Sequence, residues 1–586
     1  MHIHLPDALD TAVHMSLDSW NANKKVQKLW AKDASLWTGT NEANWLGWLN
    51  IATDQLEHIE TLEQAGHAIA QAGFTHILLL GMGGSSLCPE VFTRTFSTKA
   101  GAPILHMLDS TDPSQVAAVE ATIDLPRTKV IVSSKSGTTL EPTILKQYFF
   151  NRIKQVVEPN TVGTHFIAIT DPGSRMEAVA KRDKFDVIFH GIPSIGGRYS
   201  ALSNFGIVPA AGMGMNIRKL LTHAKNMSKQ CGATVAPEHN PGVMLGTVIG
   251  MCANEGRDKL TIVTSPALRA FGGWLEQLLA ESTGKEGKGI IPVDLEQCGP
   301  PNVYGNDRLF VYITLAGEKN SRQDARINEL QDAGHPSVHI PLADRYELGA
   351  EMFRWEMATA VAGTILGINP FNQPDVEASK IATHVLTTEY ENTGSLPPET
   401  PLLEESGIRI FIDTHNAKSL GDIAGNDKTL LGYLKAHLNT LKVGDYFALL
   451  AYIHMNETHH VLLDTIRHRV RDTKKVATCL EYGPRFLHST GQLYKGGPNS
   501  GVFVQITCDD ATDLKVPDQA YTFGIVKSAQ ARGDFQVLSE RGRRVLRLHL
   551  GTNVPAGLAV LKQTIEEALH IGHKTYPLQT RRNPQP

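Results

Sequence analysis

Short runs of aliphatic and β-branched residues recur along most of the chain, separated by longer amphipathic stretches. The first such runs fall between residues 76 and 190 and read HILLL, PILHML, KVIVSS, HFIAIT and FDVIFH. Strands buried on both faces of a parallel sheet give continuous apolar runs of this kind, and the intervening stretches fit helices that cover the sheet. The pattern therefore predicts an α/β fold with doubly wound parallel sheets.

A helical, glycine-rich stretch interrupts the pattern after residue 204, and further runs follow from KLTIVTS to RRVLRLHLG. We expect two sheets that meet near Gly212–Pro241, with a first domain over 61–230 and a second over 231–586. Residues 1–60 hold five of the seven tryptophans and are expected to form a helical arm packed on the body or on a second subunit. The end of the chain, TYPLQTRRNPQP, has too little apolar material to fold alone, so we expect a disordered tail from about residue 576.

Composition changes this picture little. The 586 residues carry a formal net charge of -4 and no long basic block, so we expect neither nucleic acid nor a membrane surface as a partner. The six cysteines form no CxxC pair, which argues against a disulfide framework and fits a reducing cytosol. No apolar run is long enough to cross a bilayer, the N-terminus lacks a signal core, and HMNETHH is not a zincin motif. We expect a soluble, cytoplasmic protein without a metal site.

Hydroxyl side chains crowd the end of one predicted strand, in the stretch VIVSSKSGTTLEP. Gly137 permits a tight turn there, and the residues after it can begin a helix whose free N–H groups point back at the loop. A helix N-terminus with hydroxyl donors forms an anion site. We expect Ser134, Ser136 and Thr139 to donate to phosphate oxygens, with Lys135 adding a charge or pointing to solvent. Helix capping is the alternative, but five hydroxyls in seven positions exceed what capping needs.

A second loop, GMGGSSLCPE, follows the strand HILLL. With Asp109 at the end of the next strand, it partly matches the fingerprint of nicotinamide-cofactor sites. However, Ser86 replaces the third glycine of that fingerprint, and a partial match is weak. Gly83 and Gly84 would instead let the backbone approach a ligand closely, with Ser85 beside it.

Several motifs occur together in a recognisable order. They are GMGGSSLCP, SSKSGTTLEP, GGRYSALSNFGIVPAA, WLEQLLAESTGKEGKG and NPFNQPDVEASK, from about Ala65 to Lys380. The chain resembles the phosphoglucose isomerase family, and in particular the isomerase half of transaldolase–phosphoglucose isomerase fusions, without the transaldolase half. The resemblance implies two sugar-isomerase (SIS) domains and a usually homodimeric enzyme. It also implies interconversion of glucose 6-phosphate and fructose 6-phosphate without metal or organic cofactor.

Proton transfer between C1 and C2 of the sugar needs a base, and the candidate is one of two residues that lie four apart. Gln277 and Glu281 share one face of a predicted helix. Apolar neighbours would raise the pKa of the Glu281 carboxyl toward the working pH, which suits a general base. The resemblance assigns that role to Glu281, a substrate contact to Gln277, and stabilisation of the enediolate to Arg198. The alternatives are a surface pair between Glu281 and Lys285, and a structural salt bridge for Arg198.

Ring opening requires a proton shuttle, and the resemblance aligns Lys380 and Gln373 with family residues at this step. A lysine on an exposed helix face is the alternative for Lys380. The histidine of the family is missing from its expected place before that segment. A fitting pattern comes later, in GPRFLHSTGQLYKGGP, where His488 and Gln492 are four apart. His488 is therefore expected to assist ring opening, with a core or surface histidine as the alternative.

Three functions compete. The first is an aldose–ketose isomerase. The second is a non-catalytic SIS protein that binds sugar phosphates; it would need the hydroxyl loop but not Glu281, Arg198 and Lys380 together. The third is a nicotinamide-dependent dehydrogenase, which the glycine pattern disfavours.

Overall fold

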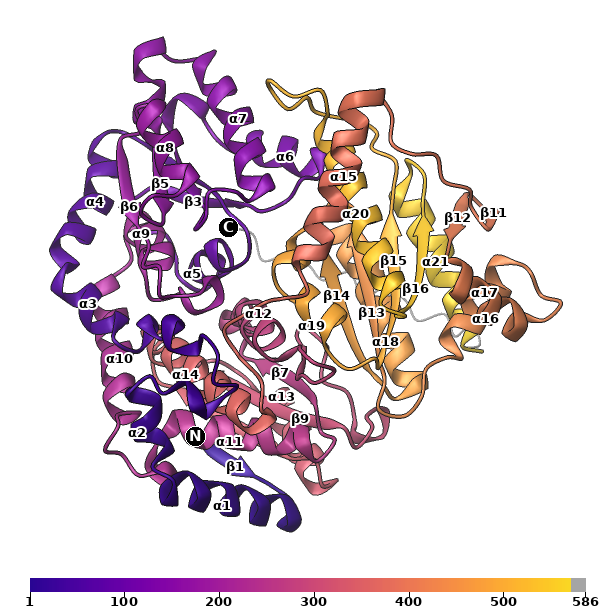
Figure 1. The fold of residues 1–586 in the computed structure, drawn as a ribbon, viewed down its shortest axis with the longest axis horizontal. Coiled ribbons are helices and arrows are strands. Elements are labelled where there is room, and N and C mark those ends of the chain that lie inside the picture. The colour runs from indigo at the N-terminus through magenta and orange to yellow at the C-terminus, as the bar shows by residue number, and fades with distance from the viewer. Residues whose placement is uncertain (571–586) are drawn as a thin grey trace.

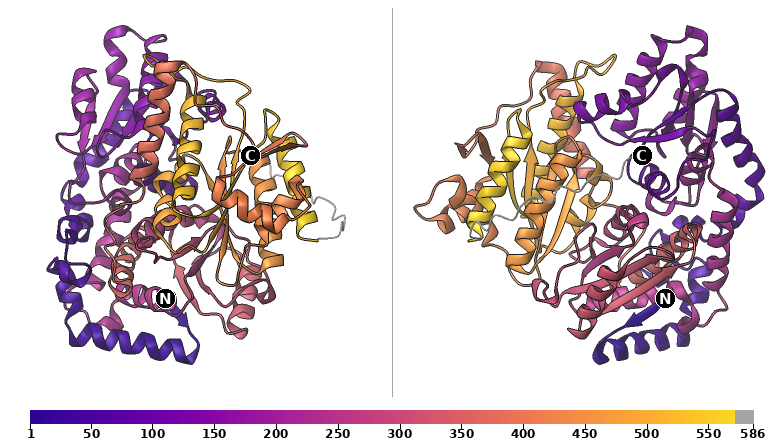
Figure 2. Two further views of the ribbon diagram at one scale, coloured as in Figure 1. Left: turned by 45° about the vertical axis from the view of Figure 1, so that its right-hand side comes forward. Right: turned by 180° about the vertical axis from the view of Figure 1, so that it is seen from behind.

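The computed structural model describes residues 1–570, and within them the chain forms three β-sheets flanked by helices (Figure 1). The α/β class and the parallel sheets predicted from the apolar runs are confirmed. Figure 2 shows from two further sides that each sheet belongs to a separate unit of the chain. The tail predicted from about residue 576 lies outside the described residues.

The first unit contains a sheet of order β3-β2-β4-β5-β6 in which all neighbouring strands are parallel. From β2 the chain adds β3 on one side and then β4 on the other, so the strand order reverses between β2 and β4. Leu80 pairs with Val132, and the loops after these two strands therefore begin side by side. Ligands of open α/β sheets bind at such a switch point. The elements are α4 (Ile59–Gln71), β2 (His76–Leu80), α5 (Leu87–Thr95), β3 (Ile104–Leu108), α6 (Pro113–Glu120), β4 (Thr128–Ser133), α7 (Leu140–Lys154), β5 (Phe166–Thr170), α8 (Arg175–Arg182), β6 (Val187–His190) and α9 (Asn204–Gly212).

The second unit is built on a sheet of order β1-β10-β9-β7-β8, which is parallel except for β1. Its elements are α10 (Ile217–Gln230), α11 (Pro241–Asn254), β7 (Lys259–Thr264), α12 (Phe271–Thr283), β8 (Ile291–Val293), β9 (Arg308–Leu315), α13 (Ser321–Asp332), β10 (Ser337–Leu342) and α14 (Leu348–Leu366). Helix α12 contacts elements of all three units, namely α5, α14 and α19. This helix therefore lies where the units meet.

The third unit corrects the sequence prediction, which placed residues 231–586 in one domain with one sheet. Its own sheet has the order β11-β12-β16-β15-β13-β14. The elements are α15 (Glu377–Thr393), β11 (Leu403–Glu405), β12 (Ile408–Phe411), α16 (Thr414–Ala424), α17 (Leu430–Leu438), β13 (Tyr446–Tyr452), α18 (Glu457–Lys474), β14 (Ala477–Tyr482), α19 (Gly491–Gly496), β15 (Gly501–Thr507), α20 (Phe523–Glu540), β16 (Arg544–His549) and α21 (Val554–Ala568). An apolar run identifies a strand but not its partner, because pairing joins residues far apart in sequence.

The N-terminal arm packs on the body of the same chain, which was one of the two arrangements expected from the sequence. Its elements are β1 (His2–His4), α1 (Asp7–Ala22), α2 (Lys25–Trp30) and α3 (Ile51–Glu57). The indole N–H groups of Trp30 and Trp37 donate to the carbonyls of Cys231 and Ala360, both at 2.8 Å. The tryptophans thus fix the arm to the helices of the second unit, and β1 adds an antiparallel strand to the second sheet.

The central strands β2, β4 and β5 of the first sheet are buried on both faces. Ile77 and Leu79 belong to an apolar cluster that continues through the arm and the second unit, whereas Leu78 and Leu80 face a separate cluster beneath α7. Alternate residues of a strand point to opposite faces, which explains why this run contains no polar position. No helix within residues 1–570 is both long and apolar enough to span a membrane.

Candidate active site

The hydroxyl loop occupies residues 134–139, between the end of β4 and the first turn of α7. Gly137 has φ +70°, a conformation that favours glycine, and so permits the turn. Ser136 and Thr138 share a hydrogen bond of 2.8 Å between their hydroxyls. Thr139 occupies the N-cap position of α7, yet its side chain makes no capping hydrogen bond there. Capping alone therefore does not explain the hydroxyls of this loop.

Two other residues of the loop are held differently. Ser134 is 3% exposed, and its hydroxyl finds no hydrogen-bond partner among the described residues. The Lys135 ammonium forms an ion pair with Asp171 and also donates to the Pro193 carbonyl at 3.3 Å. Its charge is thus neutralised within the first unit, and neither of the two sequence expectations for Lys135 describes this contact.

The glycine loop after β2 packs against the other parts of the site. Gly83 has φ +54°, and a Cβ at this position would lie 2.6 Å from the His488 carbonyl oxygen and 2.8 Å from Gln277 Nε2. A Cβ at Gly84 would overlap the Gly197 carbonyl. Glycine is required at both positions because a larger residue would push the loop away from α12 and from Arg198. Ser85 follows these glycines and is partly buried.

Asp109 serves a structural purpose here. The Ser86 hydroxyl donates to its carboxylate at 3.1 Å, and the guanidinium of Arg485 lies 3.2 Å from it. The Asp109 side chain is almost fully buried, and burial raises the pKa of its carboxyl to about 6. These contacts occupy the group that a dinucleotide ribose would need, which weakens the dehydrogenase hypothesis further.

Glu281 lies on α12, and each oxygen of its carboxylate makes one polar contact. Its Oε1 is 3.0 Å from Arg198 Nη1, and its Oε2 accepts a hydrogen bond of 3.1 Å from Gln277 Nε2. The carboxylate thus faces polar donors rather than the apolar neighbours expected from the sequence. The shared helix face of Gln277 and Glu281 is confirmed by their hydrogen bond.

Arg198 is buried, and each nitrogen of its guanidinium donates a hydrogen bond. It donates from Nε to Ser282 Oγ at 2.8 Å and from Nη2 to the carbonyls of Pro370 and Asn372, both at 2.9 Å. Its Nη1 also donates to Gln373 Oε1 at 3.2 Å, which brings that predicted residue into the site. These bonds hold the guanidinium rigidly beside Glu281, with its other face fixed by the segment after α14.

The two lysines considered from the sequence lie elsewhere. Lys285 does not pair with Glu281 but is buried, with its ammonium donating to the carbonyls of Ser282 and Asn369 at 2.9 and 2.6 Å. Burial and the Arg198 charge lower the pKa of this ammonium well below its usual range. Lys380 has a side chain 54% exposed and lies 3.3 Å from Glu377 on the same helix, α15. The structure therefore does not bring Lys380 to Glu281 or Arg198.

His488 lies at the end of the 3-10 helix Arg485–His488, next to α12. Its carbonyl accepts a hydrogen bond of 2.9 Å from Gln277 Nε2, and its ring Nε2 lies 2.9 Å from Glu141 Oε1. Burial alone raises the pKa of the Glu141 carboxyl, but the His488 charge and hydrogen bond outweigh it and leave the pKa below its usual value. Glu141 is therefore ionised, and His488 Nε2–H donates to it.

The sequence analysis missed Glu141 as a site residue. It lies in the quoted motif, directly after the hydroxyls, but a glutamate in the first turn of a helix is also an ordinary stabiliser of the helix dipole. Gln530 of α20 was missed as well, and its Nε2 donates to Glu141 Oε1 at 2.7 Å. Gln492 lies near the site and donates to the carbonyl of Gly284 and to Asp375, at 2.9 and 2.6 Å.

Together these contacts connect the hydroxyl loop to the carboxylate. Glu141 follows the loop in the first turn of α7 and bonds to His488, whose carbonyl bonds to Gln277, which bonds to Glu281. Each link is a hydrogen bond of 2.9 to 3.1 Å. A hydroxyl-rich loop, a histidine–carboxylate pair and a carboxylate beside a guanidinium are thus connected where the units meet.

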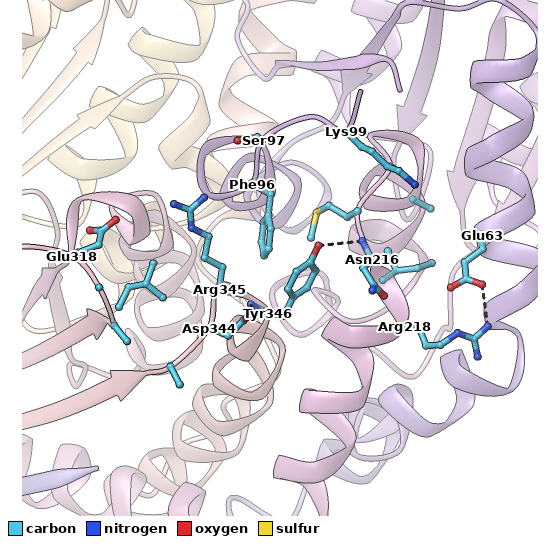
Figure 3. A pocket seen from close by; sticks show the side chains of 18 of the residues that line it. Glu63, Phe96, Ser97, Lys99, Asn216, Arg218, Glu318, Asp344, Arg345 and Tyr346 are labelled. Carbon is cyan, nitrogen blue, oxygen red and sulfur yellow. Dashed lines mark hydrogen bonds and ion pairs between the residues drawn. The ribbon is translucent and has the colours of Figure 1, made fainter. Parts of the chain in front are cut away.

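A cavity of about 1150 Å³ lies elsewhere, beyond the carboxyl ends of β9 and β10 (Figure 3). The predicted site residues all lie in the described part of the chain, and none of them lines it. Its charged groups are partly paired with one another, as in the 2.9 Å contact between Arg218 and Glu63. Size alone therefore does not locate the chemistry. In the described residues, no group of three or more metal-ligating side chains is placed to hold an ion.

Comparison with known proteins relates this arrangement to one family. A family model described as phosphoglucose isomerase matches residues 48–294. Arg198, Gln277 and Glu281 lie within that range, whereas Gln373, Lys380 and His488 lie beyond it.

Curated relatives match a longer part of the chain. A probable glucose-6-phosphate isomerase of Methanococcus maripaludis is 30% identical over 380 residues, which cover 58% of this chain and 84% of that protein. A glucose-6-phosphate isomerase of Leptospira biflexa is 28% identical over 420 residues, covering 63% of this chain and 93% of that one. The crystal structure of a hypothetical protein from Thermus thermophilus aligns with a TM-score of 0.57 at 22% identity, covering 66% of this chain and 99% of the other. That last likeness concerns the fold alone.

Proposed function

Because this chain belongs to the phosphoglucose isomerase family, we propose that it interconverts glucose 6-phosphate and fructose 6-phosphate through a cis-enediolate. It is an aldose–ketose isomerase. The roles given below to individual residues are inferred from their chemistry and contacts. The observation that carries them is the chain of hydrogen bonds from Glu141, at the hydroxyl loop, to Glu281.

The hydroxyl loop would hold the phosphate of the sugar. The free N–H groups of the first turn of α7 and the hydroxyls of Ser134, Ser136 and Thr139 supply donors without a net charge of their own. Lys135 would contribute less, because Asp171 already neutralises it. Gly83, Gly84 and Ser85 form the neighbouring wall at the switch point of the first sheet.

Glu281 would act as the base that moves a proton between C1 and C2. In the free enzyme its carboxylate contacts Arg198 and Gln277. As the base takes up the proton, negative charge passes to the sugar oxygens, and a fixed guanidinium nearby stabilises that charge more than it stabilises the ground state. Gln277 and Gln373 would contact the sugar beside them.

The His488–Glu141 pair would open the sugar ring. Glu141 accepts from His488 Nε2–H and so fixes the tautomer and orientation of the imidazole, which leaves Nδ1 to exchange a proton with the ring oxygen. Lys380 was expected at this step through the family resemblance. Its exposed position on α15 supports no contact with the ring, so His488 carries the step in this proposal.

The alternative function is a non-catalytic protein that binds sugar phosphates. It would not need a carboxylate held beside a buried guanidinium, and that pair favours catalysis. From family membership we also infer a cytoplasmic homodimer that binds neither nucleic acid nor membranes and requires no metal or organic cofactor.

A coupled assay tests the function directly. Purified protein is mixed with fructose 6-phosphate, and glucose 6-phosphate is detected by a dehydrogenase that reduces a nicotinamide cofactor. Turnover of about 1–1000 per second supports the isomerase. Binding of fructose 6-phosphate in calorimetry without any turnover would favour the non-catalytic alternative.

A further inference from the structure

A residue of the third unit, Gln530, contacts the His488–Glu141 pair. Gln530 lies on α20, whereas Glu141 lies on α7 of the first unit (Figure 1). The Gln530 Nε2 donates to Glu141 Oε1 at 2.7 Å, the same oxygen that faces His488. The His488–Glu141 pair joins the third unit to the first, because His488 lies between β14 and α19, and Gln530 adds a second contact from the third unit to Glu141.

We propose that Gln530 is a positioning residue for the His488–Glu141 pair, so that helix α20 of the third unit completes the site for ring opening. This inference rests on the proposed function. Gln530 itself is not expected to touch the sugar. It acts through Glu141, by fixing the position and the ionised state of that carboxylate.

The orientation of the Gln530 amide is determined by its second contact. Thr111, which follows β3 in the first unit, donates from its hydroxyl to Gln530 Oε1 at 2.7 Å. Because the amide oxygen accepts from Thr111, the NH₂ group must face Glu141. The Thr111, Gln530 and Glu141 side chains are 0%, 3% and 3% exposed, so water does not compete for these bonds.

A buried carboxylate at this position needs more than one donor. Moving it out of water favours the protonated form, and each hydrogen bond to its oxygens favours the ionised form. His488 supplies one side-chain donor and Gln530 a second. Without Gln530, the Glu141 carboxylate would hold its own proton more tightly and would accept less strongly from His488 Nε2–H. The nearby titratable groups are Asp109, which lies within the influence of the His488 charge, and Tyr452.

A second contact keeps α20 against the first unit. Lys527, three residues before Gln530, is buried and places its ammonium 2.8 Å from Asp112. Residues three apart lie on the same face of a helix, so Lys527 and Gln530 approach the first unit together. This anchor makes the Gln530 contact a fixed feature of the interface between the units.

The test compares Gln530→Met and Gln530→Leu with Gln536→Leu, an exposed control on the same helix. Both apolar side chains remove the donor, and methionine also keeps the length of the glutamine side chain. The steady-state kcat and KM for fructose 6-phosphate are measured from pH 5 to 9, together with the Tm of each variant.

Loss of a hydrogen bond to a charged group predicts that both Gln530 variants lose about tenfold or more in kcat. We also expect the acid limb of the kcat profile to move upward by about one pH unit, since Glu141 would retain its proton to a higher pH. KM should change by less than about threefold, because the phosphate loop is intact. Thr111→Val, which removes only the hydroxyl that orients the amide, should change kcat in the same direction by a smaller factor.

The outcomes separate this inference from the function on which it rests. If His488→Ala is impaired while both Gln530 variants and Thr111→Val keep the wild-type kcat and acid limb, the positioning role is wrong and the isomerase stands. If kcat falls equally at every pH, in step with a fall in Tm, Gln530 only docks the units. Wild-type turnover of His488→Ala would overturn the ring-opening proposal and this inference with it.

Discussion

The Oε1 atom of Glu281 lies 3.0 Å from Nη1 of Arg198, and this contact joins helix α12 of the second unit to the turn that follows the first sheet. The guanidinium is buried and held by Ser282 and by the carbonyls after α14. A base and a fixed positive charge at this separation can serve one reaction, since proton abstraction from carbon creates negative charge beside the base.

The double variant Ser136→Ala with Thr139→Ala should weaken substrate binding. These hydroxyls donate to the phosphate in the proposal, and each hydrogen bond to a charged group contributes about 1.5–3 kcal/mol. We expect KM for fructose 6-phosphate to rise by at least about tenfold, and inhibition by phosphosugar analogues to weaken in parallel. Thr161→Ala, an exposed hydroxyl of the same unit, is the matched control. An unchanged KM in the double variant would show that the phosphate binds elsewhere.

Replacement of His488 by alanine should separate ring opening from proton transfer. We expect turnover of the closed-ring hexose phosphate to fall by about 10²–10⁴-fold, the usual contribution of general acid–base catalysis. Exchange of the transferable proton with solvent, measured by NMR on an aldose phosphate too short to form a ring, should fall much less. Equal losses in the two measurements would remove His488 from ring opening.

The structure makes a different prediction for Lys380 than the family resemblance does. Its ammonium lies in an exposed pair with Glu377 three residues away, and such pairs contribute about 0.2–0.5 kcal/mol. Lys380→Met should therefore keep kcat within about fivefold of the wild type in the coupled assay. A loss of more than about a hundredfold would mean that α15 brings this lysine to the sugar during turnover, as the resemblance implies.

The sequence predicted the parts of the site that local chemistry determines. Strand ends indicated the two loops, and the 3.6-residue period of the helix indicated the shared face of Gln277 and Glu281. The same periodicity failed for Lys285, also four residues from Glu281, because α12 ends at Thr283 and the helical geometry stops there. Beyond its end the chain turns Lys285 toward the Asn369 carbonyl.

Contacts between distant segments could not be predicted in this way. Asp171 neutralises Lys135, and Gln530 meets Glu141, through the pairing of whole units rather than through any spacing in the sequence. The separate third sheet has the same cause, since each apolar run is compatible with several partner strands. The family resemblance supplied His488, and the structure supplied the carboxylate that holds it.

One stability prediction follows from the buried carboxyl of Glu481, in β14. Burial raises its pKa to about 7, above the usual value of 4.5. The folded state thus binds this proton more tightly than the unfolded state does, and stability falls as pH rises from about 4.5 to about 7. Glu481→Gln removes the titrating group and therefore this loss of stability at high pH. Its amide oxygen can still accept from the Tyr494 hydroxyl, which lies 3.0 Å from Glu481 Oε1 in the wild type.

Thermal unfolding measured at several pH values tests this prediction. The Tm of Glu481→Gln should exceed that of the wild type at pH 8, by a stabilisation on the order of 1 kcal/mol for each unit of pKa shift removed. The difference should disappear near pH 4.5. The exposed substitution Glu404→Gln should leave the Tm unchanged at both pH values, and a lower Tm for Glu481→Gln at pH 8 would contradict the reasoning.

The base itself is tested most directly by the kcat of Glu281→Gln in the coupled assay with fructose 6-phosphate, beside the exposed control Glu286→Gln. The amide keeps the size of the side chain but cannot take up the proton. We predict a fall in kcat of about 10²–10⁴-fold or more, with analogue binding nearly unchanged and Glu286→Gln equal to the wild type. Wild-type turnover by Glu281→Gln would contradict the account, because the reaction would then have a different base.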